Sequence, residues 1–242
     1  MRSEVVIMRK ALFSLILMFI AASVMAGDLA VFENLGFSPD GRYFMFGQHV
    51  LVSDAGQAYA ETAIVDISRN DFVPGGWKKG GWNVPMLPNQ ESRGALFELL
   101  RDSREVIGRY KISHLEQGRL LYIRRNGDKT AAEDSEMNGM MPSLTFRDFE
   151  YAKEYSLNLH QETKANDAAV SSAFHIEMTV MSTDGRETSY TVGRMGYFRR
   201  GVSSYEIIRV LIGPNGKSLV VIVAKTDIEN SVRYMVETLV LK

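Results

Sequence analysis

The chain has 242 residues, with 28 basic and 29 acidic side chains, a formal net charge of −1 and no cysteine. The lack of cysteine excludes disulfides, thiolate metal sites, a cysteine nucleophile and lipid attachment through a cysteine. The near-neutral charge argues against nucleic-acid binding, which needs a concentrated basic face, and against simple electrostatic adhesion to anionic lipid.

The N-terminal residues have the three parts of a secretory signal peptide. Basic residues come first, an uncharged and mostly apolar run follows over 11–26, and the run ends in small residues before the chain turns polar. The run is shorter than the roughly 20 apolar residues that a spanning helix needs, so we expect cleavage and not retention as an anchor. We therefore predict a signal peptide over 1–26, a periplasmic or secreted destination, and a single β-rich domain over 27–242 with no membrane span after cleavage.

From residue 27 onward, most of the chain alternates apolar and polar side chains, which predicts half-buried β-strands bounded by turn residues. The clearest case runs from Tyr155 to His160, where every second residue is apolar and His160 falls on the polar phase. The expected strands cover 29–37, 42–49, 59–67, 119–124, 151–161, 174–181, 187–192, 205–212, 218–225 and 232–241.

One segment has helical spacing instead. Apolar residues such as Leu96, Leu99 and Val106 recur along one face while charges fill the other, which predicts an amphipathic helix over about 92–110. The stretch 126–142 is polar, contains Gly and Met, and is typical of a long loop. Together these patterns predict a mainly β fold with one amphipathic helix. The sheets would form either an antiparallel two-sheet sandwich or a degenerate propeller-like arrangement.

The two ends of the predicted domain resemble each other. When the chain is laid on itself with a shift of 175 residues, Pro39 falls on Pro214 and Gly41 falls on Gly216. Proline presets φ at the second turn position and glycine supplies a positive φ, so each match is a strand, a tight turn and a strand. An ancient duplication explains the match, and so does the recurrence of a turn that is common in hairpin proteins.

Residues 37–43, FSPDGRY, resemble the repeat signature of WD40-like propellers of the periplasmic TolB type. The longer stretch 36–76 resembles an uncharacterised family of predicted secreted bacterial proteins, a domain of unknown function with propeller-like signatures at both ends. The resemblance covers 30–76 and 205–241. The resemblance implies that the protein is exported, and it implies no particular activity. This chain lacks the fuller Asp-Gly-Ser-Gly-type loop of the family at 53–58, so no ligand role is assigned to that loop.

No local motif indicates catalysis or metal binding. The four histidines have no zinc-type spacing, and the nucleophile elbow and the phosphate-binding loops are absent. His160 with Glu162 and His175 with Glu177 each share a strand face; two such strands side by side could assemble a metal or acid/base site, but solvated polar faces give the same pattern. We therefore predict no metal site and no cofactor, and we assign no catalytic residue.

Two segments combine aromatic and basic side chains in a way that suits binding. The Gly-rich stretch 72–82, expected to be a loop, holds both tryptophans and two lysines, which could stack on sugar rings or anchor a partner protein. Alternatively, the tryptophans fold back and close one end of a sheet. The stretch 194–201 could bind an anionic polymer or a partner carboxylate, or form an ordinary exposed hairpin tip. The candidate binding residues are Trp77, Lys78, Lys79, Trp82, Arg194, Tyr197 and Arg199.

These observations favour a non-catalytic binding or structural module of the bacterial envelope, with an envelope protein or a glycan as its partner. The competing hypothesis is a hydrolase that acts on an envelope polymer, because acid/base carboxylates can come from distant strands. A cleft with two close, buried carboxylates would favour the enzyme, and an aromatic-lined face would favour the binding module.

Overall fold

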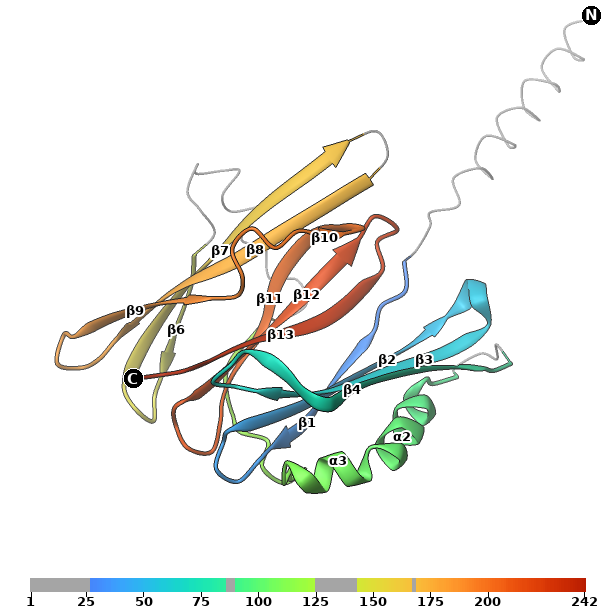
Figure 1. Cartoon of the computed structure of the whole chain (residues 1–242). Helices are drawn as coiled ribbons and strands as arrows, with labels where there is room; N and C mark the ends of the chain where they lie inside the picture. The colour runs from blue at the N-terminus through green and yellow to red at the C-terminus, as the bar shows by residue number, and fades with distance from the viewer. Residues whose placement is uncertain (1–26, 86–89, 125–142, 167–168) are drawn as a thin grey trace, which may run out of the picture.

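The computed structural model describes residues 27–85, 90–124, 143–166 and 169–242. The predicted signal peptide and the whole of the predicted loop over 126–142 lie outside these described residues. Three antiparallel β-sheets and two short helices make up the described part (Figure 1). Within it, no helix combines the length and the apolar character that crossing a membrane requires.

The three sheets differ in where their strands come from along the chain. The N-terminal sheet is a meander of β1 (Val31–Phe37), β2 (Tyr43–Val52), β3 (Gln57–Asp66) and β4 (Asp71–Asn83), with the short 3-10 helix η1 (Ser53–Ala55) between β2 and β3. The central sheet has the order β13 (Val232–Val240), β12 (Ser218–Asp227), β11 (Val202–Ile212) and β5 (Arg119–Ile123). The outer sheet has the order β10 (Arg199–Arg200), β8 (Ala169–Met181), β7 (Lys153–Asn166) and β6 (Ser143–Asp148), and β9 (Glu187–Val192) also pairs with β8.

The sheets stack as layers, and the central sheet is covered on both faces. On β12, Val221 and Val223 belong to the core shared with the outer sheet, while Val220 and Ile222 belong to the core shared with the N-terminal sheet. Because both faces of β12 are buried, its residues 219–224 are continuously apolar and do not alternate. The mainly β, antiparallel fold class is confirmed, with one more sheet than the predicted sandwich has.

The helical segment covers the far face of the N-terminal sheet (Figure 1). The predicted single helix is two helices, α2 (Arg93–Asp102) and α3 (Arg104–Arg109). The break falls at Ser103, a buried residue whose Oγ donates to the carbonyl of Leu99 at 2.6 Å. Ser side chains that bond the backbone in this way bend or interrupt helices. The apolar stripe still packs as predicted, with Leu96 and Leu99 against the alanines of β3.

The internal repeat corresponds to two three-stranded meanders that pack face to face. Shifting β2 by 175 residues gives the bounds of β12, and the pair Phe37↔Phe44 becomes Ile212↔Leu219, which is also a pair. The two matching turns touch, because Asn215 Nδ2 donates to the carbonyl of Asp40 at 3.0 Å. The stacked sheets correspond to the sandwich-like alternative, and the resemblance of the turns to propeller repeats stays a prediction.

Candidate functional site

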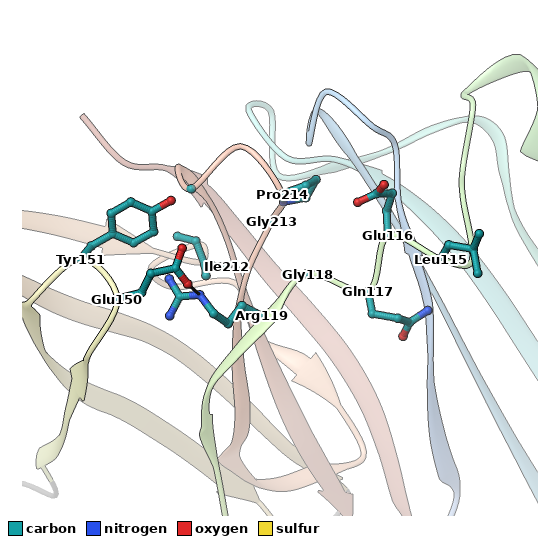
Figure 2. A pocket seen from close by; sticks show the side chains of 11 residues that line it. Leu115, Glu116, Gln117, Gly118, Arg119, Glu150, Tyr151, Ile212, Gly213 and Pro214 are labelled. Atoms are coloured by element: carbon teal, nitrogen blue, oxygen red, sulfur yellow. Dashed lines mark ion pairs between the residues drawn. The ribbon is translucent and has the colours of Figure 1, made fainter.

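An open pocket of about 320 Å³ lies at one end of the central sheet (Figure 2). Its walls come from three places in the chain: the segment 115–119 that leads into β5, residues 150–151 in the turn between β6 and β7, and residues 212–216 in the turn between β11 and β12. The second of the two matching turns therefore forms one wall of the pocket. The N-terminal sheet also reaches this place, because the N–H of Phe37, the last residue of β1, donates to the carbonyl of Glu116 at 2.7 Å.

Tyr151 forms an aromatic surface on one side of the pocket, and each of the two sides carries a glutamate. Figure 2 shows Tyr151 and Glu150 beside Arg119, with Glu116 across the pocket and Pro214 between the two groups. The Tyr151 side chain is 49% exposed. Its hydroxyl lies against Gly216, where an added Cβ would come within 3.0 Å of it, and Gly216 also has a φ of +66°. The positive φ favours glycine at this turn position, and a side chain there would also press on the Tyr151 hydroxyl.

Arg119 organises the aromatic side. Its guanidinium makes a bidentate ion pair with Asp148 at 2.6 and 2.9 Å, and its Nε lies 2.7 Å from Glu150 Oε2. The same guanidinium lies 5.3 Å from the centre of the Tyr151 ring. Burial alone would raise the pKa of Asp148, but the hydrogen bonds from Arg119 and from the backbone N–H groups of Glu150 and Tyr151 lower it below 3.8. Asp148 therefore stays ionised and holds Arg119 in place.

The chemical character of the pocket follows from this pairing. Asp148 and Glu150 both pair with Arg119, so the guanidinium brings no free positive charge to the pocket, and Glu116 supplies a carboxylate acceptor on the other side. Carboxylates accept hydrogen bonds from hydroxyl groups, and the exposed face of Tyr151 offers an apolar surface. The pocket suits a small ligand that has several hydroxyl groups and an apolar face.

The stretch 72–82 is part of strand β4, so the expected loop is wrong. Trp77 is exposed, stacks on Phe72 at 6.0 Å, and donates from Nε1 to Glu61 at 2.7 Å, with Lys79 Nζ 5.3 Å from its ring. Trp82 faces the other way and packs with α2, as in the alternative in which a tryptophan covers a sheet. Because side chains alternate along a strand, the two tryptophans cannot form one binding surface. Lys78 also lies on the helix side, where it donates to the carbonyl of Asp102.

The segment 194–201 lies where the outer sheet meets the turn between β3 and β4. Arg194 is exposed, 3.9 Å from Asp71, and Tyr197 is exposed beside Arg199. Arg199 is mostly buried; its guanidinium lies 4.8 Å from the Tyr197 ring and 3.7 Å from Glu237.

Glu237 is a buried carboxyl that no sequence motif marked. It is 4% exposed, accepts a hydrogen bond from Asn70 Nδ2, and faces Arg199. Burial raises its pKa above 4.5 despite Asn70 and Arg199, which act in the opposite direction. Nearby, burial lowers the pKa of Lys225, on which both Glu61 and Arg199 act. Glu61, which accepts from Trp77, also accepts from Gln48. Gln48 in turn donates to the carbonyl of Tyr234 on β13, and Arg199 pairs with Glu237 on β13. The segments holding Trp77 and Arg199 therefore flank the same edge of the central sheet.

None of the seven predicted binding residues lines the pocket of Figure 2. The pocket residues lie in three segments that are distant in sequence, so no local pattern joins them. The turn with Pro214 and Gly216 lines the pocket, and the internal repeat in the sequence predicts this turn. The repeat indicates a structural role for the turn and no ligand.

A comparison with protein-family models matches residues 45–239 to the family described as predicted secreted protein, DUF2259. The matched span runs from β2 to β13 and so includes strands of all three sheets. No curated protein matches the chain.

Proposed function

The chain belongs to the DUF2259 family of predicted secreted proteins, and from this premise we propose that it is a non-catalytic binding module of the bacterial envelope whose pocket takes a glycan. The family description agrees with the signal peptide predicted over 1–26, and it names no activity. Within the proposal, residues 27–242 are one exported domain, located in the periplasm or outside the cell.

The observation that supports glycan binding most is the half-exposed Tyr151 ring held beside carboxylates in a pocket. Sugar rings have an apolar face that stacks on aromatic side chains and hydroxyl groups that donate to carboxylates. The pocket volume, about 320 Å³, lies at the low end of the range for small-ligand sites. Arg119 lies against the Tyr151 ring and Asp148 accepts a hydrogen bond from the Tyr151 backbone N–H, so the stacking surface is positioned before the ligand arrives.

The alternative, a hydrolase acting on an envelope polymer, receives less support. A glycoside hydrolase needs a carboxylic acid with a raised pKa opposite a second carboxylate. In the pocket region, Asp148 has a lowered pKa and is committed to Arg119. Glu237 has a raised pKa but lies outside the pocket, against Asn70 and Arg199.

The exposed residues among the predicted set define a second surface for the same function. Trp77, Lys79, Arg194 and Tyr197 present aromatic and basic side chains along the edge of the central sheet. In this proposal Lys78, Trp82 and Arg199 have packing and ion-pair roles and touch no ligand.

The test is binding of the full exported protein to polysaccharide purified from the envelope of the source cell, measured by co-sedimentation or calorimetry. Tyr151→Ala is expected to weaken binding about tenfold, which corresponds to about 1.4 kcal/mol and is the size of an aromatic stacking contribution. Glu150→Gln is expected to weaken it as well, because an amide is a poorer acceptor for hydroxyl donors.

Phe97→Ala is the matched control, since it removes an exposed aromatic side chain on α2, away from the pocket and from the second surface. If Tyr151→Ala binds the polysaccharide as tightly as the wild type does and Trp77→Ala binds it more weakly, the ligand site lies on strand β4. Time-dependent release of reducing ends by the wild-type protein would favour the hydrolase.

A further inference from the structure

The outer sheet carries two histidines and a glutamate at one point on the face turned away from the central sheet. His160 on β7 and His175 on β8 are directly opposite each other, and their rings are parallel within 9° at a centroid distance of 4.7 Å. Glu177 is two residues further along β8, and its Oε2 lies 3.1 Å from His160 Nε2. We propose that these three side chains bind a divalent transition-metal ion, Zn²⁺.

The separations of the three side chains suit one ion. One potential ligand atom from each residue can be chosen so that all three lie within 4.8 Å of one another. Bonds of 2.0–2.1 Å in a tetrahedral site place two ligand atoms about 3.3 Å apart. His160 Nε2 and Glu177 Oε2, 3.1 Å apart, are already close to this separation, and a ligand atom of His175 lies within 4.8 Å of both.

The environment of His160 supports a ligand role. Its Nε2 is buried, and within the described ranges it has no hydrogen-bond partner, because the short contact with Glu177 lies outside hydrogen-bond geometry. A buried ring nitrogen without a partner is costly, and coordination to a metal would satisfy it. Glu177 is largely exposed, which leaves the ion an entry path from solvent.

Strand alternation explains why these residues meet. Leu159 and Ile176 point into the core shared with the central sheet, so His160, His175 and Glu177 point outward. Two imidazoles and one carboxylate form a ligand set that zinc accepts, and three protein ligands leave the fourth position open for water or a bound group. This site is separate from the pocket and does not depend on the proposed glycan binding.

The experiment is calorimetric titration of ZnCl₂ into the full exported protein, prepared without a histidine tag and dialysed against EDTA. The expected result is binding of about one ion per chain, weakened well over tenfold by His175→Phe, which keeps a ring in the stack and removes both nitrogens. Glu162→Gln is the control, since Glu162 is an exposed carboxylate on the same strand and pairs with Lys164. It should bind zinc as the wild type does.

Co²⁺ gives a second measurement that reports on the ligands themselves. The wild-type protein is expected to show the visible absorption of tetrahedral cobalt, and His175→Phe should lack it. Circular dichroism in EDTA shows whether each variant is folded, and His160→Phe provides a second variant if His175→Phe is not. The proposal would be overturned if a folded His175→Phe or His160→Phe variant bound zinc as tightly as the wild type does. Uptake of much less than one ion per chain by the wild type would also overturn it.

Discussion

Asp148 is fully buried, and its ion pair with Arg119 determines how the aromatic side of the pocket is built. The carboxylate also accepts hydrogen bonds from the backbone of Glu150 and Tyr151, so one residue holds both the guanidinium and the turn. Removing one partner of a buried ion pair destabilises the protein by more than the intact pair stabilises it, because the other charge is left buried without compensation. At the residue scale, the pocket therefore depends on a side chain that does not line it.

Asp148→Asn is expected to lower the free energy of unfolding by about 3 kcal/mol near neutral pH, at the low end for buried pairs because Arg119 is one-third exposed. The pKa of folded Asp148 lies below 3.8, so its contribution is full above that pH and is lost as the pH falls through the folded pKa. Urea unfolding from about pH 7 to about pH 3 should show the difference between wild type and variant shrinking at the acid end.

The control for this prediction is Asp184→Asn, the same substitution in an exposed turn, where the carboxylate pairs with Arg186 at the surface. It should change stability by less than about 1 kcal/mol. A loss in Asp148→Asn as small as in this control would mean that the pair contributes little.

At the scale of elements, β13 shows how a sheet edge inside the molecule is satisfied. Its outer backbone groups face the N-terminal sheet and have no neighbouring strand over most of their length. Gln48 takes the place of a strand: its Oε1 accepts from Tyr234 N at 2.8 Å, and its Nε2 donates to the carbonyl of the same residue at 3.0 Å. Asn70 Oδ1 accepts from Thr238 N at 2.8 Å. Buried backbone groups need such partners.

Gln48→Met is expected to destabilise the protein by about 2 kcal/mol, because it keeps the side-chain length and leaves two partly buried backbone groups of Tyr234 without these hydrogen bonds. Chemical denaturation measures this loss. Gln57→Met is the matched control, since Gln57 lies on β3 and its side chain bonds Asn83 at the surface; it should stay within about 0.5 kcal/mol of wild type. Equal stability of Gln48→Met and wild type would show that water or another group satisfies the edge.

At the scale of the whole molecule, the central sheet joins the other layers. Its strands share one core with the outer sheet and another with the N-terminal sheet, whose other face packs against α2 and α3. A layer buried on both faces cannot lose one neighbour without exposing apolar surface. We therefore expect residues 27–242 to unfold as one cooperative unit.

Ile222→Ala tests this coupling, because Ile222 is fully buried between the central and N-terminal sheets. It should lower stability by about 3–4 kcal/mol through lost burial and a cavity. Tryptophan fluorescence reports on β4, which holds both tryptophans, while circular dichroism reports on all strands. The two probes should give the same denaturation midpoint, before and after the substitution. Different midpoints would indicate separate folding units, and Ile123→Ala, at an exposed position, is the control.

The sequence by itself determined the elements and their kind. Alternation along 155–160 and 174–180 placed strands and their polar faces correctly, and apolar spacing placed the helical segment near 92–110, although the bond from Ser103 to Leu99 divides it. The match at a shift of 175 residues located two three-stranded meanders, in which the middle strands β2 and β12 have the same length. These successes share a cause, because burial on one face leaves a local period in the sequence.

Only the tertiary structure decided what meets across the sheets. The pairing of His160 with His175 depends on the register of two strands, and Arg119 meets Asp148 across the ends of two sheets. The Gly-rich stretch 72–82 became a strand because β3 offers it a partner, which divided the predicted Trp77 and Trp82 surface between two faces. Such contacts join residues far apart in the chain, and register and sheet order leave no local period from which to predict them.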